Sequence, residues 1–176
     1  MKWHFGCSGR FFPGWHNTDR EVDLTRLPLP FADASIDKAI GQHVIEHLSL
    51  EEELLPLFRE LRRVVRIDGV FYLSCPDIAK ICSAYCEGRL GELIDGRNRR
   101  FPGWYRFKGP QSQIVNSIFF QGGEHRNLFD YELLSWALRE GGWQTVDRIS
   151  ERELLTREPE VLPRHDDEQS LYVAAR

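Results

Sequence analysis

Small and polar residues follow several short stretches of this sequence that are predicted to form strands, in positions where an α/β protein binds a ligand. Gly6 and Gly9 follow the first stretch and Asp19 the second, while His43 and Asp77 follow two later ones. Open α/β sheets bind their ligands beyond the carboxyl ends of the strands. If these stretches are strands of one sheet, we expect the residues that follow them to surround one ligand site.

The residue types suit a ligand that carries a ribose and an adenine. Gly6 and Gly9 would let the backbone approach the ligand without a Cβ clash. A carboxylate at Asp19 can accept hydrogen bonds from both hydroxyls of a ribose. Asp23 could accept from an adenine amino group, with Leu24 packed on the ring. Taken singly, each residue also fits an ordinary turn or cap, so the prediction depends on the ordered set.

The sequence offers several candidates for a base that removes a proton from a substrate hydroxyl. They are His43, His47, Asp77 and His125. His43 and Asp77 have the best expected location, because each follows a predicted strand. For His47 we favour a structural role, as a polar residue near the start of a helix. For His125 a role as the base and a structural role both stay open. Glu46 is expected to stabilise the N-terminus of the helix that follows it.

Strands and helices alternate along the sequence and would position these residues. Strands are expected at 3–5, in the stretch 14–19 that ends at Asp19, and at 36–44, 70–74, 145–149 and 171–175. Helices are expected from near Pro56 to Asp68, at 78–85 and from Asp130 to Gly141. This alternation predicts a mostly parallel sheet with helices on its faces. The last two strands are expected to form an antiparallel pair at the sheet edge.

Two segments are expected to lack regular structure. The segment 87–127 is rich in glycine, arginine and aromatic residues, and we interpret it as an irregular insertion or lid near the substrate. A core flap or a homodimer surface is the alternative. For its basic cluster of Arg97, Arg99 and Arg100 we favour a solvated loop over contact with an acidic substrate. The acidic segment 151–169 is expected to be a loop.

The composition fits a single domain over residues 1–176, with 41% hydrophobic and 12% aromatic residues. A net charge of -4 gives no basic footprint for nucleic acid. No apolar stretch approaches the ~20 residues of a membrane span, and we see no signal peptide, so we expect a cytoplasmic protein without a membrane partner. The spacing of the cysteines does not indicate zinc, and we expect no metal.

The order of the motifs resembles class I S-adenosylmethionine-dependent methyltransferases, in particular short ones related to the type 11 methyltransferase domain. The matching segments are GCSG at 6–9, PGWHNTD at 13–19, DL at 23–24, LPF at 29–31, HVIEHL at 43–48, RVV at 63–65, PD at 76–77, LFD at 128–130 and SLYV at 170–173. The resemblance implies an α/β, Rossmann-like methyltransferase sheet. Such a sheet is mostly parallel with an antiparallel C-terminal edge strand, an abbreviated first crossover and helices on both faces.

The resemblance also implies a cofactor, S-adenosyl-L-methionine, and methyl transfer to oxygen or nitrogen of a small-molecule acceptor, such as a sugar or another biosynthetic intermediate. It assigns to the cofactor Gly6, Cys7, Gly9, Asp19, Asp23, Leu24 and His43. The glycines would line the methionine end, Asp19 would hold the ribose, and His43 would lie near the sulfonium. His43, Asp77 and His125 remain the candidates for catalysis.

Three features separate the alternatives. Only residues 10–14 lie between Gly9 and the second strand, too few for the crossover helix whose N-terminus binds a pyrophosphate. This argues against a dinucleotide or nucleotide-sugar enzyme. His4 stands where many class I methyltransferases have an acid, and Ser8 is inserted in the glycine turn. These departures keep open a non-catalytic methyltransferase-fold module that acts through a protein partner.

Overall fold

Six strands form one sheet in the computed structural model, which describes residues 1–176. They are β1 (Lys2–Phe5), β2 (His16–Thr18), β3 (Ile36–Gln42), β4 (Val65–Pro76), β5 (Val146–Ile149) and β6 (Ser170–Ala175). Their order is β2-β1-β3-β4-β6-β5. Strands β2, β1, β3 and β4 run parallel, and β6 is antiparallel to β4 and β5. The predicted mostly parallel sheet with an antiparallel pair at its C-terminal edge is confirmed.

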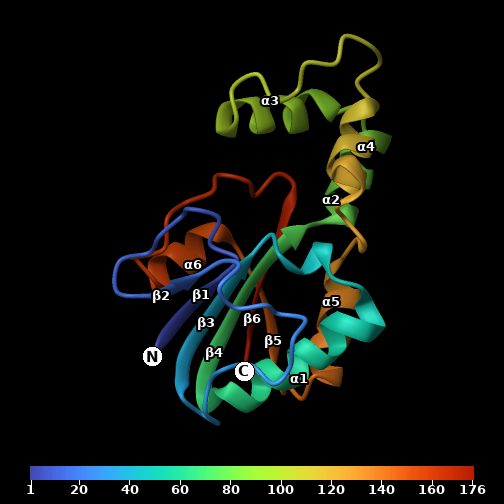
Figure 1. Ribbon diagram of the computed structural model, residues 1–176. Helices are drawn as coiled ribbons and strands as arrows, with labels where there is room; N and C mark the ends of the chain where they lie inside the picture. Colours follow the sequence, from blue (N-terminus) through green and yellow to red (C-terminus); the bar gives the residue numbers. More distant parts are fainter.

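Helices lie on both faces of the sheet, as the sequence predicts (Figure 1). They are α1 (Leu55–Val64), α2 (Ile78–Cys86), α3 (Leu90–Arg100), α4 (Gln113–Phe120), α5 (Tyr131–Glu140) and α6 (Glu151–Arg157), with single helical turns at Ile45–His47, Leu50–Leu54 and Gln121–Gly123. Helices α1 and α5 pack on one face and α6 on the other, while α3 and α4 lie beyond the strand ends. None of the helices has both the length and the apolar character that crossing a membrane requires.

Helix α1 follows directly from its local pattern. It begins at Leu55, and Pro56 lies in its first turn, where the missing N–H would have no partner within the helix. Phe58, Leu61 and Val64 lie on one side of the helix and are buried in the main core. The predicted start near Pro56 is confirmed, but the predicted end at Asp68 is wrong, because the helix ends at Val64 and β4 begins at Val65. Packing of α1 on the sheet fixes the chain that leads into it from the end of β3.

The connection from β1 to β2 contains no helix, which confirms the abbreviated first crossover. Asn17 holds it together: its Nδ2 donates to the carbonyls of Phe12 at 3.0 Å and Trp15 at 2.8 Å. Its Oδ1 accepts from the Phe12 N–H at 2.9 Å. Phe12 and Trp15 are buried with α6 on the second face of the sheet. Side-chain hydrogen bonds and two aromatic rings therefore support a turn that most βαβ units support with a helix.

Both segments expected to be irregular contain helices. In 87–127, helices α3 and α4 pack with α2 around a small separate core that includes Leu90, Leu93 and Ile114. Two glycines within α3 interrupt its apolar pattern, so the sequence does not predict this helix. One of them, Gly96, lies against Glu168, and a Cβ there would come within 2.2 Å of the carboxylate. In 151–169, α6 begins with a capping box in which Ser150 and Glu153 bond each other's backbone. The loop prediction was wrong for residues 151–157.

Candidate active site

A cleft of about 1070 Å³ lies at the carboxyl ends of the parallel strands. Gly6 and Cys7 line it from the end of β1, Asp19 from the end of β2, and His43 from the end of β3. Parallel strands bring these ends to one edge of the sheet, so residues far apart in sequence converge there. The structure thus brings together four residues that the sequence analysis assigned to one ligand.

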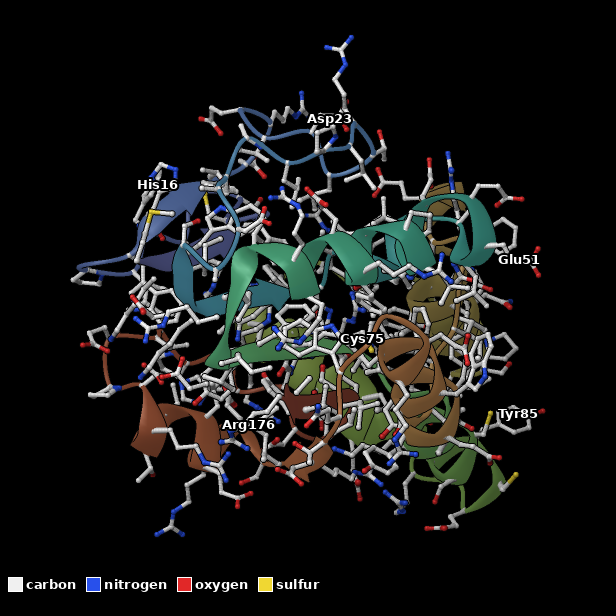
Figure 2. The ribbon with its side chains drawn as sticks, turned by 90° about the horizontal axis from the view of Figure 1, so that it is seen from below. His16, Asp23, Glu51, Cys75, Tyr85 and Arg176 are labelled. Atoms are coloured by element: carbon white, nitrogen blue, oxygen red, sulfur yellow. The ribbon has the colours of Figure 1, made fainter.

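Gly9, Asp23 and Leu24 do not line this cleft. Figure 2 shows Asp23 in a loop at the periphery, and its carboxylate accepts from the backbone N–H of Thr25 at 3.0 Å and its hydroxyl at 2.7 Å. Leu24 packs against the main core. Gly9 has open space where a side chain would stand. The assignment of these three residues to the cofactor stays a prediction, and the structure places none of them in the cleft.

Gly6 is required by both its backbone and its surroundings. Its φ of +61° lies in the left-handed region, and a Cβ would come within 2.3 Å of Val44 Cγ2. We therefore expect Gly6→Ala to lower the free energy of unfolding by about 2 kcal/mol, from strain and overpacking together. Gly9→Ala is the matched control, since Gly9 has a φ of +78° but no atom nearby. Equal losses for both variants in urea denaturation would contradict a role for the Val44 contact.

His4 lines the cleft as a neutral side chain. Its ring stacks on Phe12 with centroids 3.9 Å apart, and its Nδ1 lies 2.9 Å from Asn17 Oδ1. Burial lowers the pKa of His4 to about 4, despite the hydrogen bond to Asn17. An uncharged imidazole therefore stands at the position where the sequence analysis noted the absence of an acid. It supports the short crossover through Phe12 and Asn17.

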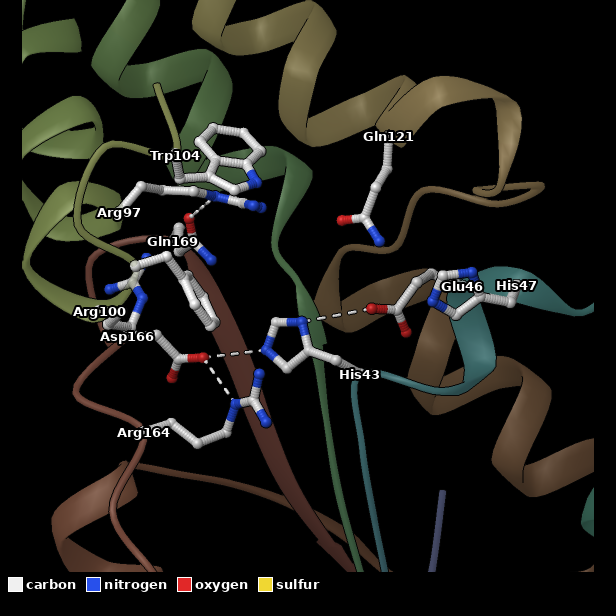
Figure 3. A pocket seen from close by; sticks show the side chains of 11 residues that line it. His43, Glu46, His47, Arg97, Arg100, Trp104, Gln121, Arg164, Asp166 and Gln169 are labelled. Carbon is white, nitrogen blue, oxygen red and sulfur yellow. Dashed lines mark hydrogen bonds and ion pairs between the residues drawn. The ribbon is translucent and has the colours of Figure 1, made fainter. Parts of the chain in front are cut away.

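His43 stands at the centre of the site between two buried carboxylates (Figure 3). Its Nε2 lies 3.0 Å from Asp166 Oδ2 and 3.1 Å from Ser170 Oγ. Its Nδ1 lies 3.2 Å from Glu46 Oε1. A φ of 57° at the end of β3 turns the residue into this position. Because both ring nitrogens already face oxygen atoms of the chain, the geometry does not favour His43 as a base for a substrate.

The charges of this group reinforce one another. Burial opposes a charge on His43, but its contacts with Asp166 and Glu46 outweigh burial and raise its pKa. Burial likewise opposes ionisation of Asp166, yet the hydrogen bond from His43 and the charge of Arg164 lower its pKa. The pKa of Glu46 is lowered because contact with His43 outweighs burial. The group therefore favours a protonated imidazole between two ionised carboxylates.

Asp77 and His125, the other two candidates for catalysis, lie outside the strand-end cleft. Asp77 is fully buried, caps α2 by accepting from the Ala79 N–H at 3.0 Å, and pairs with Arg148 at 2.9 Å. It lines neither the cleft nor the smaller pocket described below. His125 is half-buried and meets His47 edge-on, with ring centroids 4.9 Å apart. The structure therefore brings only His43, of the proposed catalytic residues, to the strand-end cleft.

A second, smaller pocket of about 320 Å³ adjoins the cleft, and residues such as His43 and Arg100 line both (Figure 3). Arg97, Arg100 and Arg164 line it, and Arg100 pairs with Glu168 while Arg164 pairs with Asp166. Arg97 is only 6% exposed. The preferred interpretation of a solvated loop was therefore wrong for Arg97 and Arg100. Their helix, α3, lies above the strand ends in Figure 1, and both arginines belong to its last turn.

Arg97 is a buried cation without an ion pair. Its Nε donates to Gln169 Oε1 at 3.0 Å, and its guanidinium lies 4.4 Å from the ring centroid of Trp104. Burial, together with the charge of Arg100, lowers the pKa of Arg97 to about 10, so it still carries its charge at neutral pH. A buried arginine stacked on an aromatic ring is well placed to bind an anion in the pocket.

Sequence reasoning missed Asp166 and Arg164 and gave Glu46 only a helix-capping role. Asp166 lies in the acidic segment 151–169, where no local pattern distinguishes it from its neighbours. Its contact with His43 spans 123 residues of sequence. The HVIEHL motif contained the only available signal, because it places Glu46 three residues after His43, a spacing that one helical turn brings together.

A family model described as a methyltransferase domain matches residues 15–73, which run from just before β2 into β4. Curated proteins give no significant match.

Solved structures share the fold at low identity. An S-adenosylmethionine-dependent methyltransferase from Mesorhizobium loti has 16% identity and a TM-score of 0.52, over 100% of this chain and 90% of that one. An S-adenosylmethionine-dependent methyltransferase from Archaeoglobus fulgidus has 12% identity and a TM-score of 0.54, over 99% of this chain and 84% of that one. The chain spans only 36% of a longer similar structure from Nostoc punctiforme. At such identities these similarities establish the fold.

Proposed function

We propose that this chain, which has the fold of a class I S-adenosylmethionine-dependent methyltransferase, transfers a methyl group from that cofactor to a small-molecule acceptor. One observation carries the proposal: the two pockets meet at His43. The larger one has the glycine turn and the acid that suit the cofactor, and the smaller one lies under α3. A reacting group at their junction would face both ligands at once.

The residues of the larger cleft fit S-adenosylmethionine. Gly6 lines the cleft, and a Cβ at this position would collide with Val44, which lines it too. The carboxylate of Asp19 lines the cleft and forms no hydrogen bond within the chain, so it can accept from both ribose hydroxyls. When bound, the cofactor supplies an electrophilic methyl group on a cationic sulfur.

His43 lies between Glu46 and Asp166, and Arg164 also bonds Asp166. When His43 is protonated, these four side chains therefore carry no net charge. We assign His43 to holding the two carboxylates in place, while the walls of the site align the reactants and exclude water.

The acceptor is best matched by a small anion, such as a carboxylate or phosphate ester. Arg97, Arg100 and Arg164 line the smaller pocket. Arg100 and Arg164 already pair with carboxylates of the chain, but Arg97 has no carboxylate partner of its own. Guanidinium groups bind the oxygens of such anions in pairs of parallel hydrogen bonds. The resemblance suggested a small molecule such as a sugar or another biosynthetic intermediate, and this assignment narrows that class to an acidic compound. Methylation of oxygen or nitrogen stays open.

Asp19→Ala should weaken S-adenosylmethionine binding by roughly 10- to 100-fold, because it removes hydrogen bonds to a charged group. Isothermal titration calorimetry with S-adenosylmethionine, S-adenosylhomocysteine and NAD measures this directly. Asp68→Ala is the matched control, since Asp68 is exposed and pairs with Arg66 away from the cleft. No saturable binding by the folded wild-type chain would overturn the proposed function, and a preference for NAD would point to a dinucleotide enzyme.

The alternative is a non-catalytic module that retains the fold and acts through a protein partner. The neutral His4 gives it support, because an acid is absent from the cofactor cleft at that position. Binding of S-adenosylmethionine without turnover on any member of a panel of small carboxylates and phosphate esters would favour this alternative over the enzyme.

A further inference from the structure

Glu46, His47 and His125 gather at one point beside the smaller pocket. One donor atom from each side chain lies within 4.8 Å of the other two. Glu46 and His47 belong to the turn Ile45–His47, and His125 follows the turn Gln121–Gly123. The backbone joins these segments, because the Arg126 N–H donates to the Glu46 carbonyl at 2.7 Å. The cluster is therefore built into the fold.

Two members of the cluster have buried polar atoms without partners. Glu46 is 1% exposed, and its Oε2 has no hydrogen-bond partner, while Oε1 has only His43 Nδ1 nearby at 3.2 Å. The Nδ1 atom of His125 is also buried and unpartnered. Leaving such groups unsatisfied is costly, and native structures seldom do so. An ion between these side chains would satisfy the carboxylate of Glu46.

The hydrogen bonding of His47 fits the same conclusion. Its Nδ1 lies 3.2 Å from the carbonyl oxygen of Glu124, which can only accept, so Nδ1 carries the proton. The lone pair of Nε2 is then available. Histidines that bind metals commonly donate their other N–H to a backbone carbonyl in this way. Glu46 in turn contacts His43, which would orient the carboxylate from behind.

We propose that Glu46, His47 and His125 bind a divalent transition-metal ion. Two imidazoles and one carboxylate form the ligand set of catalytic zinc sites and of open sites for iron and related metals. The spacing of the cysteines predicts no metal site, and this set of ligands contains no cysteine. Side chains from two separate segments supply it, so no short motif reveals it.

The position of the ion suggests its role, and this role rests on the proposed function. Glu46 and His47 line the smaller pocket together with Arg97 and Arg164. Three protein ligands leave coordination positions open on the metal. An oxygen atom of the acceptor would occupy one of them and be held beside the cofactor cleft. The substrate class is therefore an anionic compound that offers an oxygen ligand to the metal.

Titration of the tag-free, metal-free protein with Co²⁺ tests the site, because visible absorption reports its coordination. We expect equimolar binding that Zn²⁺ displaces. Glu46→Gln and His125→Ala should each weaken it by more than the roughly 10–100-fold that loss of an outer partner costs. His16→Ala is the control, since His16 is an exposed histidine on β2, outside both pockets. Circular dichroism checks that each variant is folded.

Either of two results would overturn the metal site: no Co²⁺ binding by the wild type, or equal binding by folded Glu46→Gln and His125→Ala. Calorimetry with S-adenosylmethionine separates this failure from failure of the proposed function, because Asp19 and Gly6 are not part of the metal cluster. Cofactor binding without cobalt binding would leave the proposed function standing and remove only the metal.

Discussion

Asp166→Asn should lower the free energy of unfolding by about 3–5 kcal/mol, the cost of breaking a buried charge pair on one side. Asp166 is buried and accepts from Tyr172 Oη at 2.5 Å and Arg164 Nε at 3.1 Å, while His43 Nε2 lies 3.0 Å away. Asparagine keeps the shape but removes the charge that balances His43 and Arg164. Urea denaturation near neutral pH measures the loss.

The effect should depend on pH in a definite direction. His43, Arg164 and Tyr172 face Asp166 and hold its pKa below the ordinary value of about 3.9, against the effect of burial. A carboxyl group with a lowered folded-state pKa stabilises the protein above its unfolded pKa. The difference between wild type and Asp166→Asn should therefore be full near neutral pH and shrink as the pH falls below about 4.

A matched control separates the contacts of Asp166 with His43 and Arg164 from the effect of simply removing one negative charge. Asp95→Asn changes an exposed aspartate on α3 and should alter stability by less than about 0.5 kcal/mol. If Asp166→Asn behaved like Asp95→Asn, Asp166 would not be ionised in the folded protein. His43 would then not be a cation between two carboxylates.

The sequence predicts those parts of the site that depend on local pattern. Gly6, Asp19 and His43 directly follow β1, β2 and β3, and the sheet brings the ends of parallel strands together whatever their separation in sequence. Pro56 and the apolar side of α1 similarly mark a helix through its own residues. The strand-end cleft could therefore be located before the structure was known.

The remaining parts depend on contacts between distant segments. Arg97 bonds Gln169 across 72 residues, and Asp166 reaches His43 across 123. Nothing near Arg97 in the sequence shows that α3 folds back over the strand ends, so a basic cluster there resembles an ordinary solvated surface. Asp77 shows the opposite case: it follows a strand as predicted, but its carboxylate caps α2 and pairs with Arg148.

Trp3→Ala should lower the free energy of unfolding by about 3–5 kcal/mol, the usual cost of truncating a buried tryptophan. Trp3 on β1 is fully buried, with its ring centroid 4.9 Å from that of Phe5 and 4.6 Å from that of Phe31. Its Nε1 donates to Thr18 Oγ1 at 2.8 Å. Since no crossover helix joins β1 to β2, this bond is one of the few side-chain links that hold Thr18, and hence Asp19, in place. Thermal and urea unfolding measure the loss.

Two further variants turn this stability effect into a test of the site. Trp136→Ala truncates a tryptophan on α5 that is 45% exposed, and should cost about 1 kcal/mol or less. Trp3→Phe keeps most of the buried ring but removes the donor to Thr18, so it should fold and yet bind S-adenosylmethionine more weakly than the wild type. Unchanged cofactor affinity in Trp3→Phe would mean that backbone pairing of β1 with β2 positions Asp19 without help from this side-chain bond.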